Sequence, residues 1–229
     1  MKGIQFAIIL LLQTATSLTL FSQDAVRLLD TVYGLDQTVC NGKKYAYASP
    51  SIYGHQYLFS PAYGEGSITV RGKCFYPVTV NYDLLNQQLL LQCQDASGSL
   101  NIVEVSKAWL NGFSMGTLNF ELLRIESAHR FYQVLGHGPV RILYYWRKEL
   151  ALQTTIGTSV MSFTPPIRDA YVLIEGKLKP FISNRSLVRL FDPRHKTEIR
   201  TYLRKNKIKV KNASDRAMAE MITFIDNLR

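Results

Sequence analysis

Hydrophobic and polar residues alternate along the middle of this chain, between about residues 67 and 176. A two-residue period places successive side chains on opposite faces of an extended backbone, so it predicts strands with one buried face. The period recurs in eight segments, which are residues 68–71, 78–82, 89–93, 100–105, 118–125, 130–135, 140–148 and 170–176.

Short turn signals separate the predicted strands. Gly136-His137-Gly138-Pro139 lies between two of them, and Gly98 belongs to a polar turn between two others. Consecutive strands joined by short turns form an antiparallel meander, so we expect a sandwich or an open barrel. Residues 106–111 interrupt the alternation and are predicted as one helical turn.

Beyond Pro180 the apolar residues recur with the period of a helix. Asp192 followed by Pro193 is typical of a helix start, and Ser214 is a second candidate cap. The predicted inward-facing residues are Leu187, Leu190 and Phe191 in a short turn, Ile199, Tyr202 and Leu203 in one helix, and Met218, Met221, Ile222, Ile225 and Leu228 in the last. We therefore expect an α+β protein, with a β-rich domain over residues 23–183 and a small helical module over residues 184–229.

Residues 1–22 predict a cleaved secretory signal peptide. Lys2 precedes an apolar run over residues 4–12, and cleavage is predicted after Ser22, with a cut after Ser17 as the alternative. No cysteine precedes Cys40, so no lipid anchor is expected at the cut, and no later segment is long enough for a transmembrane helix. The sequence thus predicts a secreted or periplasmic protein. A short helix over residues 24–33 and Tyr-rich loops with short strands over residues 41–66 are predicted to precede the sheet.

Three cysteines remain after the predicted cleavage: Cys40, Cys74 and Cys93. A hairpin with its turn at residues 83–87 would place Cys93 opposite Pro77, which leaves Cys74 about 10 Å away along the strand. A disulfide requires Cα atoms within about 7 Å of each other. Three unpaired thiols are therefore favoured over a bridge between Cys74 and Cys93.

Four stretches of the chain resemble a group of secreted or envelope proteins of Bacteroidota-type bacteria. They are residues 29–34 (Leu-Asp-Thr-Val-Tyr-Gly), residues 81–88 with their Asn-Tyr-Asp and Asn-Gln-Gln triplets, residues 141–146 (Arg-Ile-Leu-Tyr-Tyr-Trp) and the basic residues 202–211. The resemblance covers most of the predicted mature chain and includes no catalytic motif, so it implies location and architecture but no reaction. It also implies an aromatic residue at the position of Cys40, and Asp30-Thr31-Val32 is similar to an O-glycosylation pattern of such bacteria.

No motif in the sequence predicts a catalytic centre, a metal or a cofactor. The motifs of zinc proteases, serine hydrolases and phosphate-binding loops are absent. The four histidines, His55, His129, His137 and His195, are isolated along the chain, and a meeting of His129 with His137 across a hairpin is disfavoured. Four carboxylates on or near predicted strands leave a secreted hydrolase acting on glycan or peptide as an alternative. They are Glu104, Glu121, Glu126 and Glu175.

Aromatic residues gather on both sides of the predicted turn at His137. Tyr132 precedes this turn, and Tyr144 and Trp146 follow it. Aromatic rings with polar tips suit contacts with sugars or peptides at a surface, so these three residues form a second candidate binding site. Core packing is the alternative explanation for such residues.

The positive charge of the chain is concentrated near its end. Lys and Arg number 27 and Asp and Glu 17, for a net charge of +10. Residues 177–211 hold twelve basic and two acidic residues, which accounts for the whole excess. The candidate basic patch consists of Lys196, Arg200, Arg204, Lys205, Lys207, Lys209 and Lys211. The first three share one face of the predicted helix, and the last three alternate with apolar residues as in an extended segment.

The basic patch predicts a partner with negative charge, such as lipid headgroups, an acidic glycan or an acidic envelope protein. Nucleic acid would match the charge, but the predicted export argues against it. A solvated basic face without a partner is the alternative. We therefore expect a non-enzymatic secreted or envelope protein that binds an anionic surface component, with the hydrolase as the rival function. The sequence leaves the oligomeric state open.

Overall fold

The computed structural model describes residues 40, 42–45, 51–94, 98–125, 127–155 and 157–228. The predicted signal peptide, the predicted helix over residues 24–33 and the Asp30-Thr31-Val32 triplet lie outside the described residues.

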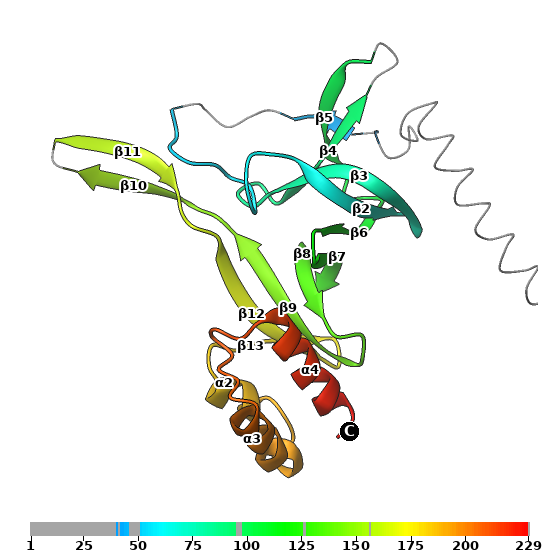
Figure 1. Ribbon diagram of the computed structural model, residues 1–229, viewed down its shortest axis with the longest axis vertical. Coiled ribbons are helices and arrows are strands. Elements are labelled where there is room, and N and C mark those ends of the chain that lie inside the picture. Colours follow the sequence, from blue (N-terminus) through cyan, green and yellow to red (C-terminus); the bar gives the residue numbers. More distant parts are fainter. Residues whose placement is uncertain are drawn as a thin grey trace, which may run out of the picture.

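Antiparallel strands followed by a small helical unit make up the structure, which confirms the predicted fold class (Figure 1). Eleven strands form one sheet in the order β1-β5-β4-β3-β2-β6-β7-β8-β9-β12-β13, and β10 and β11 pair separately. The strands are β1 (Gly42–Lys44), β2 (Gly64–Val70), β3 (Lys73–Asp83), β4 (Gln88–Gln94), β5 (Leu100–Val105), β6 (Leu110–Met115), β7 (Leu118–Ile125), β8 (Ala128–Leu135), β9 (Val140–Arg147), β10 (Leu150–Thr155), β11 (Thr158–Phe163), β12 (Ile167–Ile174) and β13 (Lys177–Pro180). Each of the eight predicted segments overlaps one of these strands.

The first part of the sheet curls on itself. Strands β5 and β6 are separated by three other strands, a distance of about 19 Å in a flat sheet. A single turn nevertheless joins them, closed by a hydrogen bond from the Trp109 N–H to the Ser106 carbonyl oxygen (3.4 Å). Strands β2 to β6 therefore curve into an open barrel. The predicted helical turn over residues 106–111 is wrong, because Leu110 already pairs with Val70 in the sheet.

The barrel is filled by inward-facing side chains of its own strands and of β7 and β8. Tyr82 is fully buried at its centre and contacts three phenylalanines, Phe113, Phe120 and Phe131, with ring centroids 5.1 to 5.6 Å apart. This cluster is distinct from a second core between the helices and strands β9 and β12. Trp146 packs against both clusters and so joins them.

The helical unit lies against strands β9 and β12, at the end of the molecule opposite the barrel (Figure 1). It consists of α2 (Asn184–Arg189), the 3₁₀ turn η1 (Pro193–His195), α3 (Lys196–Lys205) and α4 (Asp215–Asp226). Asp192 and Ser214 are N-caps, as predicted. The core side chains Ile199, Leu203, Met218, Ile222 and Ile225 are at most 3% exposed, which confirms that this unit is docked on the sheet.

Two glycines let the turn between β8 and β9 lie against α4. Gly136 has a φ of +91°, and a Cβ atom there would come within 2.6 Å of the Ile222 side chain. A Cβ atom at Gly138 would overlap the carboxylate of Asp226, which accepts a hydrogen bond from the Val140 N–H (3.2 Å). The glycines that signal a turn in the sequence therefore also permit the docking of α4.

A disulfide joins Cys40 to Cys93, with their Cα atoms 6.1 Å apart, while Cys74 is free and exposed. The prediction of three unpaired thiols is thus wrong, and so is the considered bridge between Cys74 and Cys93. Cys40 lies 53 residues before its partner, and only the fold of the described segments brings the two together. The β3–β4 hairpin also differs from the predicted register by one residue, because Val80 lies opposite Leu91.

Candidate functional site

A groove with a strongly basic lining lies between α2, α3 and the segment that follows α3. Its volume is about 750 Å³. Five of its nine lining residues are basic and none is acidic: Arg185, Arg200, Arg204, Lys207 and Lys209. The other lining residues are Asn184, Val188, Leu203 and Ile208. We call these nine residues the basic groove. Its apolar members belong to the helical core, so the cations surround an apolar floor.

The C-terminus of α3 forms one wall of the basic groove. Lys207 adopts a left-handed conformation with φ of +52°. Its N–H donates to the Arg204 carbonyl oxygen (3.1 Å), and the Ile208 N–H donates to the Leu203 carbonyl oxygen (2.9 Å). These two bonds define a Schellman motif, in which glycine is the preferred residue at the left-handed position. Here a lysine occupies that position, and it is one of the residues that line the groove.

Asn184 ties this wall to α2. Its side-chain amide donates to the Ile208 carbonyl oxygen (2.7 Å), and its side-chain oxygen accepts from the Val210 N–H (2.9 Å). Ile208 and Val210 are buried, whereas Lys207, Lys209 and Lys211 are exposed. The predicted alternation of buried and exposed residues is therefore confirmed, but the predicted extended form is wrong for its end, because the Asn212 N–H donates to the Lys209 carbonyl oxygen (2.9 Å) and closes a turn there.

The cations of the basic groove are not neutralised within the described part of the chain. None of the five takes part in an ion pair there. Arg204 also lies in the last turn of α3, where the negative end of the helix dipole stabilises a cation. The groove thus combines concave shape, apolar floor and uncompensated positive charge, which together favour an anionic ligand.

Four members of the predicted basic patch line the groove: Arg200, Arg204, Lys207 and Lys209. Lys196, Lys205 and Lys211 are not among its lining residues. Sequence reasoning included Arg185 in the charged stretch but not in the candidate site. Arg185 reaches the groove because α2 contacts the segment after α3, which lies about twenty residues later in the chain. The local spacing of residues does not predict such a contact.

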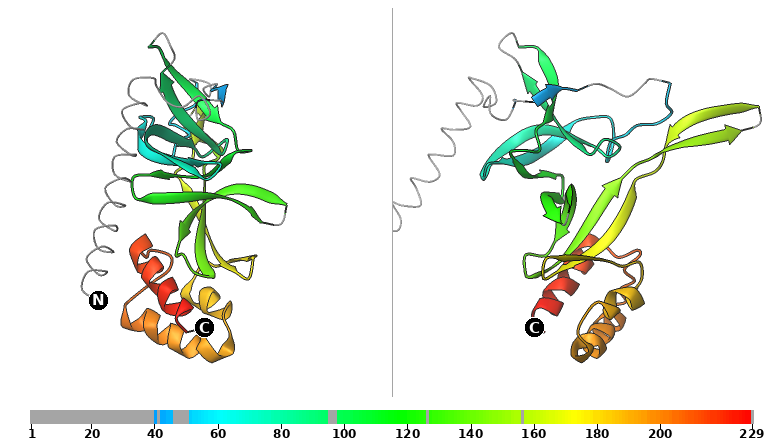
Figure 2. Two further views of the ribbon diagram at one scale, coloured as in Figure 1. Left: turned by 90° about the vertical axis from the view of Figure 1, so that its right-hand side faces the viewer. Right: turned by 180° about the vertical axis from the view of Figure 1, so that it is seen from behind.

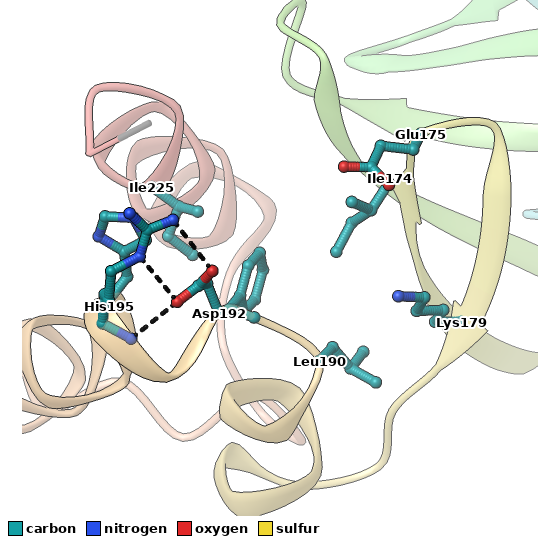
Figure 3. Close-up of a pocket in the computed structure, with 9 residues that line it drawn as sticks. Ile174, Glu175, Lys179, Leu190, Asp192, His195 and Ile225 are labelled. Atoms are coloured by element: carbon teal, nitrogen blue, oxygen red, sulfur yellow. Dashed lines mark hydrogen bonds and ion pairs between the residues drawn. The ribbon is translucent and has the colours of Figure 1, made fainter.

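A second pocket of the helical unit has a mixed lining (Figure 3). Its volume is about 570 Å³, and it lies between the β12–β13 turn and the α2–η1 connection. Lys179 and Glu175 project from the strand side and Asp192 lies on the helix side (Figure 3). The Arg194 guanidinium donates two hydrogen bonds to the Asp192 carboxylate. Side-chain and backbone hydrogen bonds from Arg194 lower the pKa of Asp192 to about 2. Because its charges largely balance, this pocket has no preference for an anion comparable to that of the basic groove.

The predicted aromatic site is not a surface. Tyr132 and Tyr144 are 3% and 2% exposed, respectively. Tyr132 packs with Tyr145 and Tyr171, with ring centroids 5.9 and 6.3 Å apart, whereas Tyr144 belongs to the core shared with the helices. The proposal of one aromatic face made of Tyr132, Tyr144 and Trp146 is therefore wrong. Tyr132 on β8 belongs to one cluster, whereas Tyr144 and Trp146 on β9 pack in another, and core packing explains these residues.

Tyr144 and Trp146 instead help to hold α4. The Arg168 guanidinium lies over both rings, 4.1 and 5.3 Å from their centroids. Arg168 also forms an ion pair with Asp215 in the first turn of α4 (2.8 Å). Gln133 connects the same groups, because it donates to the Asp215 carboxylate and accepts from the Trp146 indole N–H (2.7 Å). This network links strands β8, β9 and β12 to the helical unit.

The candidate catalytic residues are not brought together. His129 and His137 lie near opposite ends of β8, about 26 Å apart along an extended strand. Glu104 is on β5 and Glu121 on β7, where Glu121 pairs with Arg141 (2.9 Å). Glu126 lies outside the described residues. Across the described ranges, no group of three or more His, Cys, Asp or Glu residues is arranged to hold a metal ion.

Sequence reasoning missed a buried polar cluster at the start of the β10–β11 hairpin. Lys148 is 7% exposed, and its ammonium group donates to the His55 carbonyl oxygen (2.7 Å). Burial lowers the pKa of Lys148, and burial together with the Lys148 charge lowers the pKa of His55. The Lys148 N–H also donates to the Leu84 carbonyl oxygen (3.3 Å). The cluster connects this hairpin to the barrel. Its residues are far apart in the sequence, so no local pattern predicts it.

Within the described ranges, no helix is both long and apolar enough to cross a lipid bilayer. Comparisons of the chain with known protein families, with curated proteins and with solved structures find no match.

Proposed function

We propose that this protein is a non-enzymatic binding protein of the cell envelope or exterior, and that it holds an acidic glycan in the basic groove. The observation that carries this proposal is the lining of the groove, which places five cations and no acid around an apolar floor. The pocket beside the β12–β13 turn contains two carboxylates among its cations and lacks this bias.

The chemistry of the groove favours a glycan over other anions. Three of its five cations are arginines, whose planar guanidinium groups bind carboxylate, sulfate or phosphate oxygens in pairs. The apolar floor suits the C–H faces of sugar rings, which alternate with the acidic substituents along such a polymer. A concave groove accepts a chain, whereas a planar bilayer surface requires a flat or convex basic face.

The strained lysine at the end of α3 supports a role for this site. A left-handed conformation costs a residue other than glycine about 1–2 kcal/mol. Lys207 bears this cost while it lines the groove. Strained backbone positions are common at functional sites, and the strain at Lys207 places a cation in the groove lining.

The proposed location rests on other features. The N-terminal pattern predicts export, and the resemblance to secreted proteins of Bacteroidota-type bacteria points the same way. The disulfide between Cys40 and Cys93 is of the kind that oxidising compartments favour. In such a location acidic polysaccharides are available as ligands and nucleic acids are scarce.

A salt titration with a soluble acidic polysaccharide tests the proposal. The affinity of the chain for heparin is measured at increasing NaCl concentrations, with dextran as the neutral control polymer. We expect binding to heparin at low salt, a steep loss of affinity as salt screens the charges, and no binding to dextran. Equal affinity for both polymers, or no affinity for heparin at low salt, would overturn the proposal.

A further inference from the structure

The β10–β11 hairpin stands away from the rest of the molecule as an arm (Figure 1 and Figure 2). We call residues 150–163 the arm. Pro165 and Pro166 follow it and lack the N–H groups that would continue the β9–β12 ladder. The arm is thereby separated from the main sheet as a two-stranded ribbon.

One face of the arm is apolar and open to solvent. The register pairs Leu152 with Met161 and Leu150 with Phe163, so these four side chains share a face. Leu152 is 62% exposed, and Leu150 and Met161 are also exposed. A contiguous apolar row on a projecting element is typical of a surface that another protein chain covers.

The arm contains no charged residue, although the whole chain has 44 of them. Exposed edge strands are usually protected by lysines, by other charges or by proline, because an open edge pairs with other chains. In β10 this protection is missing. One edge of β11 is partly covered at its base, where Tyr53 exchanges backbone hydrogen bonds with Met161 and Phe163 (2.9 and 3.0 Å). Among the described residues, β11 is the only strand that pairs with β10.

We propose that the arm is a dimerisation element, and that two copies of this chain pair their β10 strands antiparallel about a twofold axis. Such an isologous contact joins two ribbons into a four-stranded sheet and gives both open edges a partner at once. A two-stranded ribbon alone is marginally stable in water, so the added strands also stabilise each arm.

Charge favours a second copy of the chain as the occupant. Two molecules that each have a net charge of +10 repel one another over most of their surfaces. The uncharged arm is a segment where they can meet without contacts between like charges.

Sedimentation velocity over a range of protein concentrations tests the inference. The protein is the full chain with Cys74→Ser, so that no disulfide-linked dimer forms through the exposed thiol. We expect a monomer–dimer equilibrium that shifts toward the dimer as salt is added, because salt screens the repulsion between the two copies. This direction is opposite to that expected for glycan binding, so the two proposals fail independently.

A matched pair of variants locates the contact. Leu152→Lys adds a charge to the edge strand and is expected to leave only the monomer. Leu100→Lys adds the same charge at a leucine of similar exposure (65%) on β5 and should retain the dimer. Their unfolding midpoints show that both variants are folded. A parent chain that is monomeric at every concentration, or a Leu152→Lys variant that dimerises like its control, would overturn the inference.

Discussion

The side chain of Asn184 donates a hydrogen bond of 2.7 Å to the Ile208 carbonyl oxygen, and both residues line the basic groove. The same side chain accepts a hydrogen bond from the Val210 N–H, so Asn184 makes both hydrogen bonds to this segment. The position of Lys207 and Lys209 in the groove therefore depends on α2 as well as on α3.

Replacement of Asn184 by alanine should weaken both the fold and the site. Two backbone groups of a partly buried segment would lose their partners, at a cost of about 1–3 kcal/mol in the free energy of unfolding. Heparin affinity should fall as well, because the lysines of this segment lose their fixed positions. Denaturant unfolding and a heparin titration measure the two effects. Asn212→Ala, at an exposed asparagine nearby, is the control, and equal behaviour of the two variants would contradict the assigned role.

Lys207→Gly separates stability from binding. Glycine adopts the left-handed conformation without strain, so the variant should gain about 1 kcal/mol in stability. It also removes one cation of the groove, so its affinity for heparin should fall. Lys205→Gly, in the last turn of α3 and outside the groove lining, should instead lose about 1 kcal/mol and retain its affinity. A less stable Lys207→Gly variant with unchanged affinity would refute this account of the C-terminus of α3.

The network around Asp215 should be the main polar attachment of α4. Asp215→Ala removes an ion pair with Arg168 and leaves the buried Gln133 amide without its acceptor. We expect a loss of about 1–3 kcal/mol, measured by denaturant unfolding. The control is Glu220→Ala on the same helix, where the exposed pair with Arg216 should contribute about 0.5 kcal/mol or less. Similar losses in both variants would mean that the network does not hold the helix.

Stability should decrease in mild acid because of His55. Burial and the nearby Lys148 hold its pKa below the ordinary value of 6.5, so the unfolded chain binds the proton more readily than the native protein. Stability from this group is therefore present above the ordinary pKa, and it is lost as the pH falls from there through the lowered pKa of the folded protein. His55→Gln should flatten the fall of the melting temperature between about pH 7.5 and pH 5.5. If His129→Gln, at an exposed histidine, flattened it equally, the effect would not come from the cluster.

The periodic parts of the fold are predictable from the sequence, and the long-range contacts are not. Strands such as β8 and the caps at Asp192 and Ser214 depend on local patterns, which is why their predictions are confirmed. The arm was missed because its apolar residues do not alternate regularly, and Gly157, with φ of +83°, is its clearest turn signal. The Cys40–Cys93 disulfide was missed because its partners meet only in the folded chain.

In the candidate site, too, local features were predictable from the sequence and long-range contacts were not. The excess of charge in residues 177–211 predicted a basic patch, and four of its seven residues line the groove. The groove itself forms where α2 packs against the segment after α3, and a count of charges cannot predict that packing. The aromatic candidates failed for a related reason, since tyrosine and tryptophan fill cores as readily as they cover surfaces.

Two charge-matched triple variants test the central claim most directly. One replaces Arg200, Arg204 and Lys209 in the groove by glutamine, and the other replaces Lys196, Lys205 and Lys211, which lie outside its lining. Heparin affinity is measured for both as a function of salt. Three lost contacts of about 0.5 kcal/mol each correspond to about a tenfold loss of affinity, so the groove variant should bind about tenfold more weakly with a shallower salt dependence. The other variant should stay close to the parent chain. Equal losses in both would show that the ligand responds to diffuse charge and would contradict a binding site in the basic groove.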